Sequence, residues 1–339
     1  MSAAPGLDAV LPWLQPAQQA MARAIDNDRL GHAVLLHVPQ ESGGEWLARW
    51  SAARLFCRAQ DAPRPCGVCL DCRRVAADQH PDCQYVPLLD EAREIKIDQV
   101  REMVSWLVLS SHGGAHKLAI IAPAERLNRH AANSLLKTLE EPTPGTLLIL
   151  VAAELGRLPA TVLSRCTRIT VPVPDRASVL TWLQAEGPAG VDWPAVLAAV
   201  GNRPLAALAA NPAVVASVAS EVRTALEAAC AGELDPVETA ESWSRDGYVL
   251  RLDCIENWIT ERVRAVAGRR NGQSEMRAAA HLPARGLLLN IRALFESLDL
   301  VREARSLAES TVNKSLVLER LLRRLAPTPG ARARGSNLE

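Results

Sequence analysis

The sequence has neither an excess of one charge nor a long apolar run. Its 339 residues hold 38 Lys plus Arg and 38 Asp plus Glu. A protein that holds duplex nucleic acid unaided normally carries a basic excess, because it must neutralise phosphates. A run of about 18 apolar residues, which a membrane-spanning helix requires, is also missing. These absences argue against a lone duplex-binding protein and against a membrane partner.

The N-terminal residues indicate a reducing compartment, and the compartment in turn decides how the cysteines are interpreted. The first residues, MSAAPGLDAVLPWLQP, lack the basic region and the apolar core of a signal peptide, so we expect a cytoplasmic protein. There, the eight cysteines are better explained by a metal site than by a disulfide framework.

Apolar patterning predicts an α/β fold in the first half of the chain. Short apolar runs alternate with helical periodicity, a pattern typical of a parallel sheet flanked by helices. Asn128 is the predicted N-cap of one such helix, which Pro142 ends. The predicted strands are residues 34–38, 85–88, 118–121, 147–151 and 168–171.

Strand signals stop near residue 173, and helical periodicity continues through an Ala-, Leu- and Arg-rich remainder. Helices are expected over residues 177–187, 193–200, 205–210, 214–231, 248–268 and 312–326. The sequence therefore predicts an α/β core at 1–172, a small helical lid at 173–211 and an all-helical domain at 212–326. A tail at 327–339 has no apolar periodicity, and we expect it to be disordered.

Four cysteines in the pattern C-x8-C-x2-C-x2-C have the spacing of a structural zinc site. Two-residue spacings let successive thiolates turn onto one ion, and Gly67 permits the tight turn. Four thiolates close the coordination shell, so the expected role is to hold a loop rather than to catalyse. The alternatives are redox cysteines or a coincidental spacing. His80 and Cys83 are reserve ligands, but for both we favour a structural role, as a structural histidine and a small buried apolar cysteine. The predicted ligands are Cys57, Cys66, Cys69 and Cys72.

The segment after the first predicted strand has the strand-loop-helix arrangement of a phosphate-binding loop but lacks the residues that bind phosphate and magnesium. Such a loop directs backbone N–H groups at phosphates and adds a lysine and a magnesium-binding hydroxyl. With Gly43 as the last glycine, Val38 occupies the first glycine site, Gly44 the lysine site and Glu45 the hydroxyl site. The first lysine in the chain is Lys96, so none upstream replaces the missing one.

Ser42 and Glu45 have instead the spacing of a capping box, in which their side chains satisfy the first N–H groups of the helix. We therefore predict that side chains fill the place of a phosphate, that Glu45 repels an anion there, and that ATP does not bind this chain. The alternative is an ordinary strand-turn-helix without nucleotide ancestry.

Several segments together resemble the AAA+ clamp-loader subunits of bacterial DNA polymerase III. The order and spacing of these segments match the family over residues 8–175, and a weaker match lies at 313–325. The motifs LLKTLEEP and SRC, taken together, are specific for this family. The family comprises the gamma or tau ATPase, delta-prime and delta, and the resemblance is closest to the delta-prime branch. The matching segments are RLGHA (29–33), the four-cysteine module, HPD (80–82), NSLLKTLEEP (133–142) and LSRC (163–166).

The resemblance implies an ATP site that has lost its other elements as well. An active gamma or tau subunit has an acidic Walker B pair and a polar sensor, where this chain has residues 122–123 (AP) and 152–153 (AA). Proline 204 stands at the arginine position of the second sensor, one residue after Arg203. A subunit that does not hydrolyse ATP is therefore expected. The alternative, an active gamma- or tau-type subunit, is disfavoured because such a site works mainly by positioning phosphate and magnesium.

One functional element survives, namely Ser164, Arg165 and Cys166. In the family this arginine reaches the γ-phosphate of ATP bound by a neighbouring subunit, a task that suits a permanently charged, bidentate guanidinium. The resemblance therefore implies that Arg165 is an arginine finger in trans, and the alternative is a structural salt bridge.

The resemblance also implies the partners. The chain would be a scaffold in a pentameric clamp loader with gamma or tau and delta, its helical domain joining the collar, and the assembled complex would load the sliding clamp onto primed DNA. Lys137 has two open interpretations, contact with DNA phosphate or pairing with Glu140 or Glu141 on its helix. A zinc-dependent nucleic-acid-binding protein is a weaker hypothesis, since no basic and aromatic clusters surround the cysteines.

Overall fold

The computed structural model describes residues 6–60, 62–89, 92–113, 116–270, 291–308 and 313–325. The chain divides into two compact units, which we describe separately. The first contains Met1–Gly187 and Arg203–Leu205, and the second contains Pro188–Asn202 and Ala206–Glu339. The predicted tail at 327–339 lies outside the described residues, and the three-domain division remains a prediction.

A parallel five-stranded sheet of order β2-β3-β4-β1-β5 forms the centre of the first unit. Strands β3 and β4 are buried along their whole length, as expected of parallel strands that are covered on both faces. Each predicted strand overlaps an observed one, so the predicted parallel sheet is confirmed. The bounds are β1 (Ala33–His37), β2 (Cys83–Pro87), β3 (Lys117–Ala122), β4 (Thr146–Ala152) and β5 (Thr167–Thr170).

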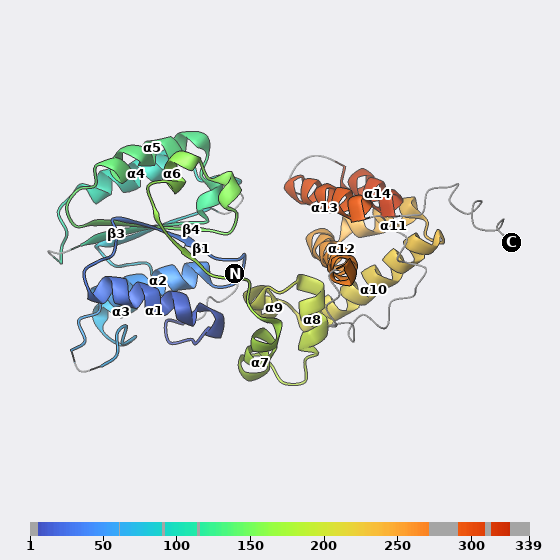
Figure 1. Cartoon of the computed structure of the whole chain (residues 1–339), viewed down its shortest axis with the longest axis horizontal. Helices are drawn as coiled ribbons and strands as arrows, with labels where there is room; N and C mark the ends of the chain where they lie inside the picture. The colour runs from blue at the N-terminus through green and yellow to red at the C-terminus, as the bar shows by residue number, and fades with distance from the viewer. Residues whose placement is uncertain are drawn as a thin grey trace. The chain divides into compact units, whose positions relative to one another are not determined.

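Helices cover both faces of this sheet (Figure 1). The core under α4 and α5 includes Leu35, Met103, Ile121, Leu135 and Leu150. One layer consists of α1 (Gln15–Asp26), α2 (Gly44–Phe56) and α3 (Leu70–Ala76), and the other of α4 (Ile97–Leu107), α5 (Arg129–Glu140) and α6 (Ala160–Leu163). Short 3-10 turns are η1 (Pro12–Leu14), η2 (Ala124–Arg126) and η3 (Leu155–Arg157).

The start of α5 is fixed by the predicted cap. The Asn128 side-chain oxygen accepts a hydrogen bond from the Ala131 N–H at 2.8 Å, which satisfies a donor that the first helical turn leaves open. The helix ends at Glu140, ahead of Pro142, because a residue before proline is disfavoured in the helical conformation.

Replacing Asn128 by alanine should lower the free energy of unfolding by about 1 kcal/mol, the usual contribution of an N-cap side chain. Urea denaturation followed by circular dichroism measures the effect. Asn128→Ser keeps an acceptor at this position and serves as the control. Equal losses in both variants would show that packing, and not the cap, is responsible.

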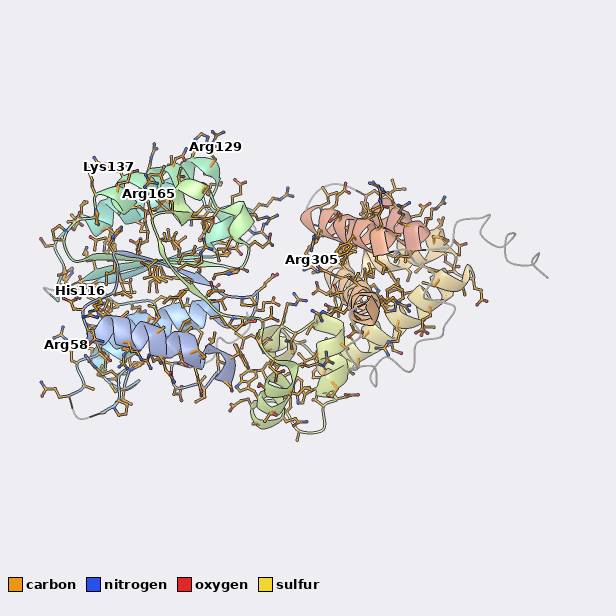
Figure 2. The ribbon with its side chains drawn as sticks, in the orientation of Figure 1. Arg58, His116, Arg129, Lys137, Arg165 and Arg305 are labelled. Atoms are coloured by element: carbon orange, nitrogen blue, oxygen red, sulfur yellow. The ribbon has the colours of Figure 1, made fainter. Side chains whose placement is uncertain are left out.

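Within the described residues of the second unit, every regular element is a helix, and short turns connect these helices. Helix α13 is held to α12 by Arg305, labelled in Figure 2, which pairs with Asp253 and lies 2.6 Å from Glu256. No helix in the described ranges combines the length and apolarity that a membrane crossing needs. The helices are α8 (Trp193–Val200), α10 (Pro212–Ala231), α11 (Pro236–Arg245), α12 (Tyr248–Arg270), α13 (Ile291–Ser306) and α14 (Lys314–Leu325), while α7 (Arg176–Glu186) lies in the first unit and α9 (Pro204–Ala209) begins there.

Candidate functional site

The loop between β1 and α2 is packed against apolar side chains from the N-terminal segment. Gly43 has a φ of +92°, and a Cβ at this position would lie 2.8 Å from Leu11 Cδ1 and 3.0 Å from Leu14 Cδ1. Both leucines are fully buried. The Trp13 indole N–H donates to the Ser42 carbonyl at 2.8 Å. The N-terminal segment therefore lies directly on the last glycine of the loop.

The predicted capping box is wrong. Helix α2 begins at Gly44 with Gly43 as its N-cap, and no side chain caps it. The box needs the glutamate at the third helical position, whereas Glu45 stands at the second because the left-handed Gly43 shifts the helix start by one residue. The Glu45 carboxylate instead accepts a hydrogen bond from the Tyr85 hydroxyl at 2.6 Å.

A different carboxylate of the loop pairs with an arginine near α9. Glu41 Oε2 lies 3.1 Å from the Arg203 NH1 atom, and the Glu41 carbonyl accepts from the Leu205 N–H at 3.1 Å. Glu41 itself has a φ of 53°, a conformation that non-glycine residues adopt only when other contacts hold them. No local pattern in the sequence indicates this pair, because its members are far apart in the chain.

The end of β3 carries no acidic pair at the expected Walker B position, and the end of β4 carries no polar residue at the expected sensor position. Ala122 and Ala152 end these strands and are both buried. The nearby Glu125 accepts a hydrogen bond from the Ala153 N–H at 3.2 Å, and burial raises the pKa of Glu125. This carboxylate therefore connects the two loops that follow the strands.

The four predicted cysteines lie together, as their spacing requires. Their sulfur atoms are all within 4.8 Å of one another. A tetrahedral zinc site with Zn–S bonds of about 2.3 Å has sulfur separations of about 3.8 Å, so the cluster fits zinc after a small contraction. Cys57 and Cys72 are buried, while Cys66 and Cys69 are partly exposed.

Backbone N–H groups of the cysteine loop point at the sulfur atoms. The N–H groups of Cys66, Cys69 and Cys72 donate to the sulfurs of Cys57, Cys66 and Cys69 at 3.3–3.4 Å. Hydrogen bonds to a thiolate favour its charged form, and the N–H groups of Cys69 and Val68 lower the pKa of Cys66 to about 6. These hydrogen bonds therefore favour the thiolate form of Cys66, whereas burial raises the pKa of Cys72.

The two reserve ligands have structural contacts of their own. The His80 ring stacks on Phe56 with centroids 4.1 Å apart, and its Nδ1 accepts from the Asp82 N–H at 3.1 Å. Cys83 belongs to β2, where burial raises the pKa of its thiol to about 12. Neither residue belongs to the sulfur cluster of the described residues.

Arg165 lies in the turn between α6 and β5, next to α5 (Figure 2). Its NH1 group donates to the Thr161 carbonyl at 3.0 Å and to the Ser164 hydroxyl at 3.3 Å. Its NH2 group lies 2.5 Å from Glu140 Oε1, and the arginine side chain remains 35% exposed. Cys166 packs against the core under α5, and burial raises the pKa of its thiol to about 11.

The candidate groups form separate sites. Arg165 belongs to the α5–α6 layer, whereas the cysteines belong to the α2–α3 layer across the sheet (Figure 1). Lys137 is exposed on α5, and Glu140, one of its two suggested partners, pairs with Arg165. Contact of Lys137 with DNA remains a prediction.

Comparison with known proteins gives the family. Residues 14–175 match the family described as "DNA polymerase III, delta subunit". DNA polymerase III subunit delta' of Pseudomonas aeruginosa is 30% identical over 330 residues, which cover 95% of this chain and 98% of the relative. The Haemophilus influenzae subunit delta' is 34% identical over 205 residues, covering 60% and 62% of the two chains.

Two other proteins are similar to the chain over a shorter stretch or at lower identity. DNA polymerase III subunit tau of Escherichia coli is 32% identical over 147 residues, which cover 43% of this chain and 22% of tau. The solved Thermotoga maritima protein related to the DNA polymerase III gamma subunit is 16% identical, with 91% and 98% of the two chains covered and a TM-score of 0.43. Because the similarity to subunit delta' runs along almost the entire sequence, the chain belongs to the delta-prime family of DNA polymerase III clamp-loader subunits.

Proposed function

We propose that this chain is a clamp-loader subunit that does not hydrolyse ATP and that supplies Arg165 to ATP bound by a neighbouring gamma or tau subunit. The observation that carries the proposal is the loop at Gly43, where protein side chains pack and the ATP-binding groups are missing. The second part of the proposal, the role in trans, is supported by Arg165, because its guanidinium is held in place and is still partly exposed.

The geometry at residue 44 supports the absence of ATP binding. A Cβ on Gly44 would lie 2.7 Å from Val151 Cγ1 and 3.1 Å from Val38 Cβ. The position that holds the phosphate-binding lysine in an active subunit therefore has no room for a side chain. Arg203, which lies next to the second-sensor position, is paired with Glu41 of the same loop, so this guanidinium is engaged by a carboxylate of its own chain.

ATP with magnesium, titrated into the isolated chain in a calorimeter, should give no saturable binding, with any dissociation constant above roughly 1 mM. The cognate gamma or tau subunit is the positive control, since its loop carries the lysine and the hydroxyl. Micromolar binding by this chain would contradict the proposal, and so would hydrolysis by the purified chain alone.

A guanidinium acting in trans fits the chemistry of the neighbouring site. Phosphoryl transfer spreads negative charge over the equatorial oxygens, and an arginine finger stabilises that charge. Arginine stays protonated at all physiological pH values, and its planar N–H groups match phosphate oxygens. Arg165 can therefore contribute to hydrolysis although its own chain lacks a catalytic site.

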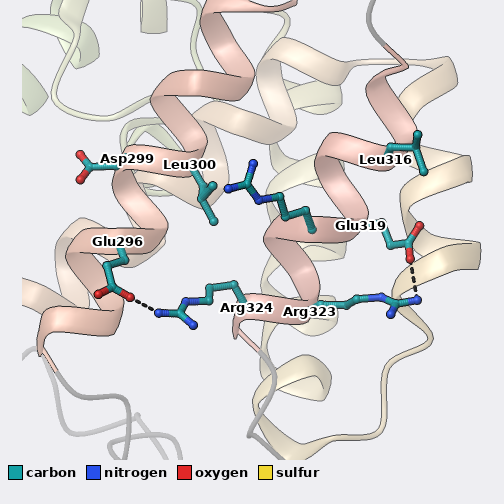
Figure 3. Close-up of a pocket in the computed structure, with 8 residues that line it drawn as sticks. Glu296, Asp299, Leu300, Leu316, Glu319, Arg323 and Arg324 are labelled. Carbon is teal, nitrogen blue, oxygen red and sulfur yellow. Dashed lines mark hydrogen bonds and ion pairs between the residues drawn. The ribbon is translucent and has the colours of Figure 1, made fainter.

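The second unit is proposed to join the collar of the clamp loader, with gamma or tau and delta as partners. A groove of about 710 Å³ lies between α13 and α14 (Figure 3), and the Glu296–Arg324 and Glu319–Arg323 pairs lie along it. Leu300 and Leu316 also line this groove, and Leu316 is 60% exposed. A groove that combines exposed apolar and charged side chains suits a protein partner.

The other expected components belong to the assembled complex. The four-cysteine module is proposed to hold a structural zinc ion, which would order the loop between α2 and α3. The sliding clamp and primed DNA would be engaged by the complex, which is consistent with the zero net charge of this subunit. Co-elution of the chain with the ATPase and delta subunits tests the partners directly.

A further inference from the structure

The two most specific motifs of the sequence are joined by an ion pair. Glu140, in the LEEP segment, is the last residue of α5, and Arg165, in the SRC segment, follows α6. Their side chains meet at 2.5 Å between Glu140 Oε1 and the Arg165 NH2 group. The contact gives a physical reason for both motifs to occur in one chain.

These contacts hold the Arg165 guanidinium in place but do not use all of its N–H donors. NH1 donates to the Thr161 carbonyl and the Ser164 hydroxyl, and NH2 faces Glu140. These contacts use three of the five N–H donors that a guanidinium has, so others stay available for a phosphate. A partly exposed arginine that is held by carboxylate, carbonyl and hydroxyl groups keeps its position before a partner arrives, which lowers the entropic cost of reaching the phosphate.

The helix backbone that carries Glu140 is held by packing and by a contact with His32. The residue before it, Leu139, is buried against the core, and its carbonyl lies 2.9 Å from His32 Nε2. One turn earlier on the same helix face, Leu135 is fully buried. The C-terminal carbonyl groups of a helix also favour a nearby cation. Packing therefore holds the backbone at the end of α5, and the Glu140 side chain, which is 51% exposed, extends from it to Arg165.

We propose that Glu140 is the positioning residue of the arginine finger, holding the Arg165 guanidinium in the orientation in which it meets the γ-phosphate of a neighbouring subunit's ATP. The inference rests on the proposed function of Arg165. Glu140 itself does not touch the nucleotide, so its whole contribution to hydrolysis passes through the arginine.

The test is DNA-stimulated ATP hydrolysis by the complex reconstituted with Glu140→Ala, Glu140→Gln or Glu141→Ala. At the one site that Arg165 serves, Glu140→Ala should lower kcat about 10-fold, since a misplaced catalytic group can cost up to about 100-fold, and should leave KM for ATP unchanged. The total rate of the complex should fall by no more than the share that this site contributes. Glu140→Gln keeps an acceptor oxygen and should lose less. Glu141 is exposed on the same turn, and Glu141→Ala should behave as wild type.

A double variant separates positioning from a structural role. Adding Glu140→Ala to Arg165→Ala should lower the rate no further than Arg165→Ala alone, while co-elution and melting temperature stay at wild-type values. Full activity of Glu140→Ala, a higher rate than wild type, or additive losses would overturn the inference while Arg165→Ala remains defective. A wild-type rate in the Arg165→Ala complex would instead contradict the proposed function of Arg165, and the inference with it.

Discussion

Replacing Arg165 by alanine is expected to remove most of the ATP hydrolysis at the one site that this chain serves, by about 10³-fold or more at that site. The reason is electrostatic: the guanidinium would stabilise charge that develops on the transferred phosphoryl group, and alanine offers nothing in its place. The total rate of the complex should fall by the share that this site contributes.

Two further variants make the result specific. Arg165→Lys keeps the charge but loses the planar fork of donors, so it should also be defective. Arg168 is an exposed arginine on β5, and Arg168→Ala should hydrolyse ATP at the wild-type rate. Steady-state phosphate release with primed DNA measures all three, and co-elution confirms assembly. Equal activity of the Arg165→Ala and wild-type complexes would remove the arginine-finger proposal.

Loss of the cysteine cluster is expected to have the second large effect. The purified chain should carry one zinc ion, and Cys69→Ser should carry none, because a structural site needs four protein ligands. Structural zinc contributes about 10–16 kcal/mol in isolated zinc-finger peptides. Here α3 also packs through Cys72 and Val75, so the effect should concentrate in the loop between α2 and α3.

Atomic emission gives the zinc content, and protease susceptibility of the cysteine loop reports its order. Cys83→Ser is the matched control, since this reserve ligand lies in β2 outside the cluster and should leave one zinc per chain. Zinc should also be released as the pH falls, because protons compete with the metal for the thiolates. Full zinc content in Cys69→Ser would contradict the four-thiolate site.

Patterns that depend on near neighbours in the sequence were predictable. Buried strands such as β3 and β4 appear as apolar runs, and Asn128 marks the start of α5 by its own side-chain chemistry. The cysteine cluster follows from its spacing, because short loops leave few ways to arrange four sulfur atoms. These features require no knowledge of how distant segments pack.

The errors and omissions share one physical cause. The capping box failed because Gly43 adopts a left-handed conformation, which sequence spacing alone does not specify. The ion pairs Glu41–Arg203 and Glu140–Arg165 join residues far apart in the chain, and the packing of Leu11 on Gly43 depends on where the N-terminal segment lies. Such contacts are set by tertiary structure, so only the folded chain reveals them.

The most direct measurement of the central claim is a titration of the purified chain into its cognate ATPase and delta subunits with ATP and primed DNA present. We predict that the chain alone hydrolyses no ATP, and that the rate of the mixture rises until it saturates at a fixed molar ratio. The Arg165→Ala chain should be incorporated at the same ratio, with a rise that is smaller by the share of the site that Arg165 serves. Hydrolysis by the chain alone, or the same rise with both chains, would contradict the account.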